Sequence, residues 1–496
     1  MQNNISKNNN QQKIYECILL TIILLIALYL RLNKLDYTSL WTDECLTVKL
    51  STKESLLYTI DCVLGTSQQP FYFIIMNLWI KLFGKSEFIL RLPSVIFGLA
   101  SVFMTYAVSN RLFKNSQIAL ISSFLLAVSV FNIDHSQDAR PYTLATLLSL
   151  ISIYFFIKLL EKGSFWDLLL YVISTTLLVY THLFIGTFTI IAQVGYLITT
   201  LLFREKNGFN LKDWLLTYLI ILVLLFPLAF AIFSKIKGLS EIAFWVPKAD
   251  LIRVFRTFTI YFSGSDTLFV IFVLLIATGL FLSSNKRELY FLFLQLITPV
   301  LILYGISKLW KPAFIERYTL FASIPYYILV ACGIIEAGKY KRVLKVLLII
   351  PILILSVLSL QNYYKTYAPF TYKTINWKEV KNYIEENVTS NDLVIYDSPF
   401  IKDLIFYYYP INKNLNEIGF PWRDISKANY DAISAQLEPA LRKSKRVWLL
   451  EYHIEDKKKF IQKKLNKSFK FVRDRKYNKG HGFEELNIKL FERYMP

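Results

Sequence analysis

Long apolar stretches separated by short polar loops dominate the first 360 residues. The pattern predicts about eleven membrane-spanning helices, because each stretch approaches the roughly 20 apolar residues that cross a bilayer. The expected spans are residues 14–32, 91–113, 117–133, 141–160, 166–181, 183–203, 213–233, 267–283, 289–306, 315–337 and 343–360. The first stretch continues to Leu32 without a small-residue cleavage site, so we expect a retained span and not a removed signal peptide.

The pattern changes after Gln361. Residues 377–386 and 457–467 have helical periodicity, and the apolar runs 393–396 and 447–452 are typical of buried strands. We therefore expect two domains, a transmembrane domain over residues 1–360 with a long first outer loop at 33–90, and a soluble α/β domain over residues 361–496.

Composition supports a membrane protein. Hydrophobic residues make up 54% of the chain, which excludes a wholly soluble enzyme and a disordered protein. The formal net charge is +20, and much of the basic excess flanks apolar spans, so anionic lipid is the expected partner and nucleic acid is not. Cys45 and Cys62 share one loop, so at most one disulfide is expected and none is required.

Charges in the short loops predict the orientation. With the N-terminus in the cytoplasm, the basic loops near residues 111–114, 158–162, 204–206, 286–287 and 339–342 all fall inside, as the positive-inside rule requires. An odd number of spans then places residues after Gln361 outside. The outer loops also carry basic residues, and this fits the predicted orientation if some of these cations serve a functional site. We expect a multi-pass protein of the cell membrane whose active site and C-terminal domain are extracytoplasmic.

Three polar clusters lie at the predicted outer ends of spans: Trp41–Glu44, Asp134–Tyr142 and Glu316–Tyr318. Helix capping, a local ion pair or an interfacial aromatic anchor would explain parts of each cluster. Together, however, they offer carboxylates and guanidinium groups at one membrane level. Transfer from a lipid-linked phosphate needs cations to stabilise the leaving phosphate and a carboxylate to act as general base on the acceptor.

Short motifs along the chain carry a family resemblance. They are Leu30-Arg31-Leu32, Trp41-Thr42-Asp43-Glu44, Pro70-Phe71-Tyr72, Ser86-Glu87, Arg91-Leu92-Pro93-Ser94, Ser136-Gln137-Asp138-Ala139-Arg140-Pro141-Tyr142 and Arg317-Tyr318. In order and spacing, over roughly residues 14–340, they resemble GT-C glycosyltransferases of the protein O-mannosyltransferase and aminoarabinose-transferase superfamily. One difference is Gln68-Gln69-Pro70, where many relatives carry His-Pro-Pro, so a histidine role at that place is not expected here.

The resemblance implies transfer of a sugar from a polyprenyl-phosphate donor to an acceptor at the outer face of the membrane, with inversion at the anomeric carbon. It also implies roles for particular residues. The implied catalytic residues are Asp43 as the base, Glu44 and Asp138; the donor-phosphate contacts are Arg91, Arg140 and Arg317; and the substrate-binding residues are Gln137, Tyr142 and Tyr318. The acceptor, which could be a protein, a lipid or a glycan, is left open.

Cofactor use is also left open. No cofactor is certain from the sequence, although a divalent metal could be held with Glu44 or His135 among its ligands. A hydrogen-bonded neutral His135 is the simpler interpretation. The chain lacks a P-loop and a G-x-G-x-x-G fingerprint, which disfavours a soluble nucleotide donor. The alternative functions are a transporter or flippase of lipid-linked sugars, a polysaccharide polymerase or ligase with a lipid-diphosphate donor, and a membrane-anchored binding protein.

Overall fold

The structure is a computed structural model of the chain. It describes residues 2–66, 68–203, 208–234, 249–367, 375–396, 401, 404, 415–419, 430–452, 459–477 and 486–494. These residues form two compact units. The first contains Met1–Leu35 and Lys53–Lys365, and the second contains Asp36–Thr52 and Thr366–Pro496. The second unit thus includes part of the predicted first outer loop as well as the C-terminal domain.

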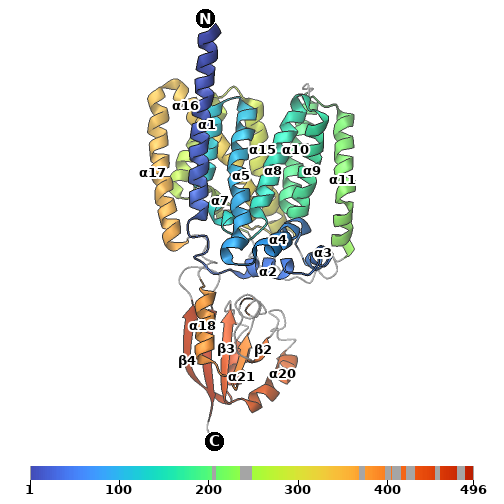
Figure 1. The fold of residues 1–496 in the computed structure, drawn as a ribbon, viewed down its shortest axis with the longest axis vertical. Coiled ribbons are helices and arrows are strands. Elements are labelled where there is room, and N and C mark those ends of the chain that lie inside the picture. Colours follow the sequence, from blue (N-terminus) through green and yellow to red (C-terminus); the bar gives the residue numbers. More distant parts are fainter. Residues whose placement is uncertain are drawn as a thin grey trace. The chain divides into compact units, whose positions relative to one another are not determined.

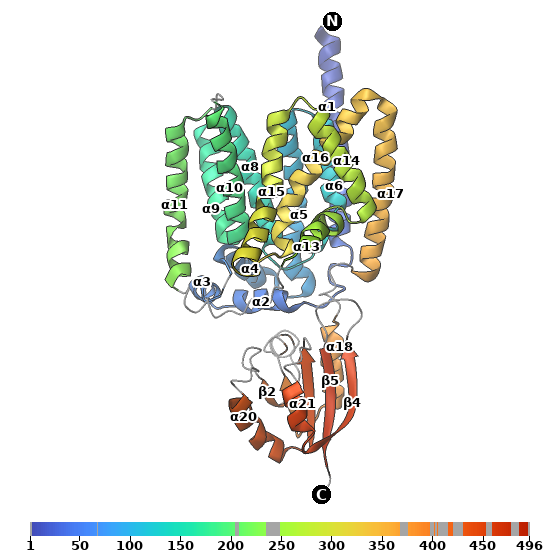
Figure 2. The same ribbon diagram turned by 180° about the vertical axis from the view of Figure 1, so that it is seen from behind.

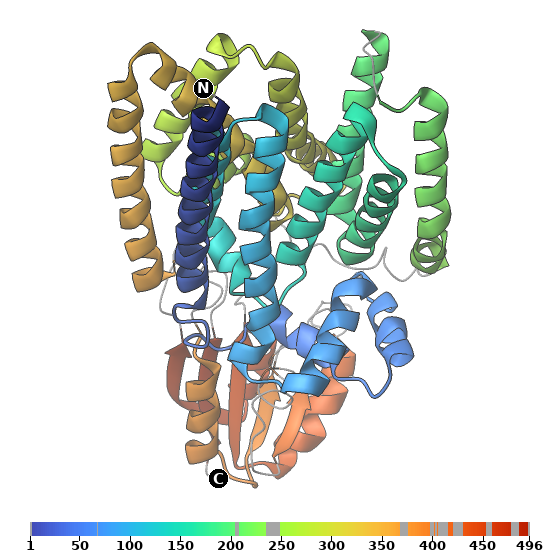
Figure 3. The same ribbon diagram turned by 45° about the horizontal axis from the view of Figure 1, so that its top comes forward.

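The first unit is a bundle of helices (Figures 1 and 2). Within the bundle, α17 and α11 stand at opposite edges in all three ribbon views (Figure 3). The helices are α1 (Gln2–Leu32), α3 (Leu56–Leu64), α4 (Pro70–Phe83), α5 (Glu87–Phe113), α6 (Ser116–Val128), α7 (Val130–Ser136), α8 (Tyr142–Lys162), α9 (Phe165–Thr181), α10 (Leu183–Leu202), α11 (Leu211–Ser234), α13 (Leu251–Arg256), the π-helical turn η1 (Thr257–Phe262), α14 (Asp266–Leu282), α15 (Lys286–Leu309), the 3₁₀ segment η2 (Glu316–Ala322), α16 (Ser323–Tyr340) and α17 (Arg342–Thr366).

The predicted membrane class is confirmed, since the described part of the chain contains eight helices long and apolar enough to cross a bilayer. Two further predicted spans are bent helix pairs: α6 and α7 meet at 61°, and the α13–η1 segment meets α14 at 92°. The predicted span at 166–181 corresponds to α9, a shorter apolar helix. Every predicted span therefore has a helical counterpart, whereas the number of helices that cross the membrane stays a prediction.

Both breaks have local causes in the chain. Ser129, between α6 and α7, is extended, and its hydroxyl accepts the Asn132 N–H as the N-cap of α7. The second break contains Gly264 at φ +82°, a left-handed conformation that side chains rarely adopt. Glycine therefore allows the chain to turn sharply before α14 begins.

The second unit contains helix α2 (Thr42–Ser51) and a five-stranded sheet with strand order β2-β1-β3-β5-β4. Strands β2, β1 and β3 are parallel, and β5 pairs antiparallel with both β3 and β4. The remaining elements are α18 (Trp377–Asn387), β1 (Leu393–Tyr396), β2 (Asn416–Gly419), α20 (Tyr430–Lys443), β3 (Arg446–Tyr452), α21 (Lys459–Leu465), β4 (Phe469–Tyr477) and β5 (Leu486–Arg493). The predicted α/β class of the C-terminal region is confirmed.

The core of the sheet follows from the sequence pattern. β1 is buried along its whole length, and β3 is buried from Val447 onward, as expected for strands covered on both faces. Leu437 and Leu441 of α20 and Leu465 of α21 pack in the same apolar cluster as Leu393 and Leu449. The predicted helix 457–467 is confirmed over Lys459–Leu465; residues 457 and 458 lie outside the described residues. All four cysteines are thiols, so Cys45 and Cys62 do not form a disulfide.

Candidate active site

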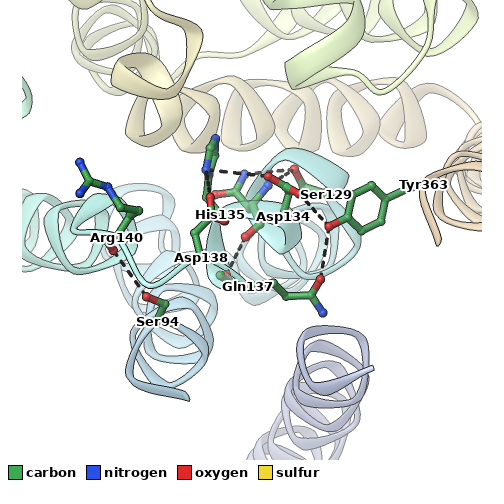
Figure 4. A network of polar contacts seen from close by, with 10 residues as sticks. Ser94, Ser129, Asp134, His135, Gln137, Asp138, Arg140 and Tyr363 are labelled. Carbon is green, nitrogen blue, oxygen red and sulfur yellow. Dashed lines mark hydrogen bonds and ion pairs between the residues drawn. The ribbon is translucent and has the colours of Figure 1, made fainter. Parts of the chain in front are cut away.

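Helix α7 and the turn that follows it hold three ionisable side chains close together. Asp134, His135 and Asp138 each place a potential ligand atom within 4.8 Å of the others, and all three side chains are buried. His135 Nδ1 lies 3.1 Å from Asp138 Oδ2 (Figure 4). Burying two carboxylates is costly unless they are paired or hydrogen-bonded, so such a group marks a functional site in a membrane protein. We call these three residues the carboxylate–histidine group.

Two residues fix the carboxylate–histidine group to the ends of neighbouring helices. Tyr363, near the end of α17, donates its hydroxyl to Asp134 Oδ1 at 2.8 Å and to Gln137 Oε1 at 3.2 Å (Figure 4). The Gln137 amide then donates to the carbonyls of Asn33 at 2.8 Å and Arg31 at 3.0 Å, at the end of α1. These contacts join α1, α7 and α17, and the predicted substrate contact of Gln137 stays a prediction.

Cationic and aromatic side chains gather around Tyr142, the first residue of α8. The guanidinium carbons of Arg140 and Arg317 lie 5.9 and 5.8 Å from the centre of the Tyr142 ring. The rings of His182 and Tyr318 lie 5.7 and 6.4 Å from the same ring, centroid to centroid. The structure thus brings together four of the predicted site residues, from two sequence clusters. We call these five side chains the arginine–aromatic group.

The two groups are adjacent within the first unit. The His135 ring lies 5.4 Å from the Tyr142 ring, so the aromatic residues connect the carboxylates to the guanidinium groups. Arg140 is 3% exposed, and its Nη2 donates to Gln68 Oε1 at 3.2 Å. Two cations, of which Arg140 is buried and Arg317 partly exposed, and two buried carboxylates can together bind and activate a phosphate-linked substrate.

His182 joins α9 to α10 and caps the latter. Its Nδ1 accepts the backbone N–H of Ile185 at 3.4 Å, which leaves Nε2 to carry the proton of the neutral ring. Burial, followed by the positive charges of Arg140 and Arg317, lowers the pKa of His182 from 6.5 to about 3. The histidine is therefore neutral at physiological pH and offers an Nε2–H donor instead of a third positive charge.

An ion pair positions Arg317 from outside the group. Glu316 accepts two hydrogen bonds from Arg253, Nε to Oε1 at 2.6 Å and Nη2 to Oε2 at 3.1 Å. This bidentate pair joins α13 to the first residue of η2, next to Arg317. Glu316 is thus bound to a distant arginine, a pairing that spacing along the sequence could not reveal.

Arg91 was predicted to contact the donor phosphate. Its side chain is 1% exposed, and its Nη1 donates to the carbonyl of Leu35 at 2.7 Å, which ties α5 to the segment after α1. The phosphate contact of Arg91 stays a prediction, and the bond found here supports the fold.

Asp43 and Glu44 lie in the first turn of α2, within the second unit. Glu44 is fully buried, and its Oε2 accepts the backbone N–H of Trp41 at 3.3 Å, which is the reciprocal bond of a capping arrangement. Asp43 is half-buried. The structure therefore gives Glu44 a role in helix capping, and the catalytic role of Asp43 stays a prediction.

The residues of the carboxylate–histidine group fit a divalent cation. Two carboxylates and an imidazole are ligands that Zn²⁺ and similar ions accept, and their atoms converge closely enough to share one ion. Among the described residues this group consists of His135, Asp134 and Asp138, and the use of a metal by His135 stays a prediction. Glu44 is not a member of the group.

Three contributors to the site were not identified from the sequence: His182, Tyr363 and Gln68. His182 could have been found, because it is the one polar residue between the predicted spans 166–181 and 183–203, at a predicted outer end. Tyr363 has no such signal. It lies at the end of an apolar helix, where tyrosine is common as an interfacial residue, and only the fold brings it to Asp134.

Comparison with known proteins agrees with the fold and the motifs. The sequence matches the family described as dolichyl-phosphate-mannose-protein mannosyltransferase over residues 67–231. This segment includes Arg91, the carboxylate–histidine group, Arg140, Tyr142 and His182, and it begins after Asp43. A relative, an uncharacterized protein of Aquifex aeolicus (strain VF5), is 21% identical over 359 residues, which cover 69% of this chain and 70% of the relative.

Solved structures share the architecture. ArnT from Cupriavidus metallidurans in the apo state matches with a TM-score of 0.61 and 11% identity, and the match covers 95% of this chain and 97% of ArnT. ArnT bound to undecaprenyl phosphate matches with a TM-score of 0.51 and 13% identity over the same shares of the two chains. An Archaeoglobus fulgidus oligosaccharyltransferase in complex with Zn and sulfate matches with a TM-score of 0.50 and 13% identity, over 87% of this chain and 67% of the other.

These matches define the class of the protein. It is a multi-pass membrane protein with the GT-C fold, similar to membrane glycosyltransferases, and the resemblance predicted from the sequence motifs is confirmed.

Proposed function

We propose that the protein transfers a sugar from a polyprenyl-phosphate carrier to an acceptor at the outer face of the cell membrane. The observation that carries this proposal is the arginine–aromatic group, where Arg140 and Arg317 flank the Tyr142 ring. Helices α8 and α10 both begin within this group, at Tyr142 and beside His182, and helix N-termini favour anions. ArnT, which shares the fold, has been solved bound to undecaprenyl phosphate.

The donor phosphate binds to the two guanidinium groups in this proposal. Arg140 and Arg317 neutralise the phosphodiester and then stabilise the phosphate that leaves with the polyprenol. His182 is neutral and donates a hydrogen bond through Nε2–H to a phosphate oxygen. The aromatic rings of Tyr142 and Tyr318 keep water away from the reacting bond, which strengthens these electrostatic contacts.

Asp43 is the general base in the proposed reaction. Its carboxylate takes the proton from the acceptor hydroxyl or amine, and the acceptor atom forms a bond to the anomeric carbon. The bond between that carbon and the phosphate oxygen breaks, and its electron pair stays on polyprenyl phosphate. Because the acceptor attacks opposite the leaving group, the configuration inverts.

The carboxylate–histidine group orients the acceptor in this proposal, with Asp138 held by His135 and Asp134 held by Tyr363. A divalent cation bound to Asp134, His135 and Asp138 would supply positive charge for binding the donor or the acceptor. The hydrogen bond from Tyr363 fixes the position of the Asp134 carboxylate.

Mass spectrometry of lipid-linked sugars and envelope glycans, in cells with and without the protein, tests the proposed function. We expect one polyprenyl monophosphate sugar to accumulate when the protein is absent, together with loss of that sugar from a glycan, lipid or protein. Accumulation of a lipid diphosphate instead would identify a polymerase or ligase. A lipid-linked sugar that changes leaflet between the two strains, while all glycans keep that sugar, would identify a flippase. Either of these two outcomes would overturn the proposal.

A further inference from the structure

Helix α2, which carries Asp43, is part of the same compact unit as the C-terminal domain. The segment before α2 contacts that domain through Tyr37 and Ser39. The rings of Tyr37 and Tyr367 stack at 6.3 Å with an interplanar angle of 10°, and Ser39 Oγ donates to Asn376 Oδ1 at 3.3 Å. The chain of the first loop therefore lies against residues that follow the last transmembrane helix.

A third contact reaches the first turn of α2 itself. The hydroxyls of Thr42 and Tyr452 lie 2.9 Å apart and share a hydrogen bond, although the two residues are 410 positions apart in the sequence. Thr42 is the first residue of α2 and directly precedes Asp43. A hydrogen bond at this position restrains the start of the helix and with it the backbone of the candidate base.

Tyr452 is well placed to hold a neighbour in position. It is the last residue of β3, the middle strand of the five, and it pairs with Leu486 of β5, so its backbone is held within the sheet. Its side chain is 1% exposed, and its ring lies 5.8 Å from the ring of Trp377, itself a buried residue of α18. The Tyr452 side chain is thus held in place by packing at the carboxyl end of the middle strand.

The two acidic residues in the first turn of α2 differ in burial. Glu44 is fully buried and accepts the Trp41 N–H, as described above, whereas Asp43 is half-buried. The hydrogen bond between Glu44 and the Trp41 N–H stabilises the first helical turn, and the hydrogen bond between Thr42 and Tyr452 joins that turn to the sheet. Together they define the position of the Asp43 backbone relative to the C-terminal domain.

We propose that the C-terminal domain positions the candidate base, and that Tyr452 is the positioning residue through its hydrogen bond to Thr42. The inference rests on the proposed function, since it assigns Asp43 as the base. It gives the C-terminal domain a part in the chemical step in addition to any part in binding the acceptor. Loss of the hydrogen bond should then slow transfer and leave donor binding unchanged.

Tyr452→Phe and Thr42→Val, singly and together, test the proposal in the full-length protein. Each removes one hydroxyl and keeps most of the side-chain volume. The rate at which membranes consume the accumulated lipid-linked sugar should fall roughly tenfold in each single variant, because small displacements of a catalytic group cost much of the rate. The double variant should be no slower than the single ones, because both changes break the same bond. The affinity for undecaprenyl phosphate should be unchanged in all three.

Tyr477→Phe is the matched control. Tyr477 is a buried tyrosine of β4 in the same domain, and its hydroxyl has no hydrogen-bond partner within the described part of the chain. Removing this hydroxyl should leave the rate at which membranes consume the lipid-linked sugar unchanged. Amide hydrogen exchange across α2 provides a second readout, independent of turnover: exchange should be faster in Tyr452→Phe and the same as wild type in Tyr477→Phe.

The result that would overturn the inference is unchanged consumption together with unchanged α2 exchange in Tyr452→Phe. Additive effects in the double variant would also contradict it. If the proposed function itself is wrong, Asp43→Asn will retain turnover, and this result distinguishes that failure from a failure of the positioning role. An inactive Asp43→Asn variant beside a fully active Tyr452→Phe variant would refute the positioning role of Tyr452 alone.

Discussion

Replacing Arg140 with alanine should weaken the binding of a polyprenyl phosphate. Arg140 is 3% exposed as a residue, and its guanidinium lies beside the Tyr142 ring and Gln68. A hydrogen bond to a charged partner contributes about 1.5–3 kcal/mol. Since about 1.4 kcal/mol changes a dissociation constant tenfold, the loss of one such contact predicts that Kd rises by about 10- to 150-fold.

Titration of undecaprenyl phosphate into the protein in nanodiscs, followed by native mass spectrometry or thermal shift, measures this change. Arg140→Lys keeps a point charge and loses the planar fork of donors, so its Kd should lie between those of wild type and Arg140→Ala. Arg111→Ala is the control, because Arg111 forms a partly exposed ion pair with Glu161 outside the arginine–aromatic group and should not affect binding. A Kd for Arg140→Ala equal to that of wild type would refute the phosphate contact.

Three further changes test other parts of the site. Tyr363→Phe should lower the unfolding free energy by about 1.5–3 kcal/mol, because the Asp134 carboxylate loses a donor; a melting temperature equal to that of the control Tyr304→Phe would contradict this. The wild type should lose stability as the pH falls from 6.5 toward about 3, because His182 is protonated in the unfolded chain over this range but stays neutral in the folded protein. His182→Asn can still cap α10 and should therefore have a smaller slope of melting temperature against pH. Equal slopes in the two proteins would refute the lowered pKa of His182. Gln295→Met should be neutral or stabilising, because the buried Gln295 amide has no hydrogen-bond partner within the described part of the chain; a large loss of stability would show that the amide is satisfied.

Much of the fold could be predicted from the sequence because a bilayer leaves few alternatives. Apolar stretches of sufficient length must be helical, since backbone groups have no other partners in lipid, and each predicted stretch is a helix in the structure. The breaks were not predicted. Hydropathy does not register that Ser129 caps a new helix or that Gly264 takes a positive φ, since both lie within or beside apolar runs.

The candidate site was predicted in part. The dense polar run from Asp134 to Tyr142 was recognisable because charges at the ends of spans are costly. The long-range pairs at the site were not recognisable from the sequence. Tyr363 is separated from Asp134 by 229 residues, and Glu316 is separated from Arg253 by 63. The sequence also did not show that Asp43 belongs to the same unit as the C-terminal domain, because contacts such as that between Thr42 and Tyr452 join residues 410 positions apart.

Turnover by Asp43→Asn tests the central claim most directly. The change is nearly isosteric and removes the carboxylate that would accept the acceptor's proton. We predict that membranes carrying this variant no longer consume the lipid-linked sugar, while expression and the affinity for undecaprenyl phosphate stay at wild-type levels. Consumption of the lipid-linked sugar at the wild-type rate would contradict the account and remove Asp43 from the mechanism.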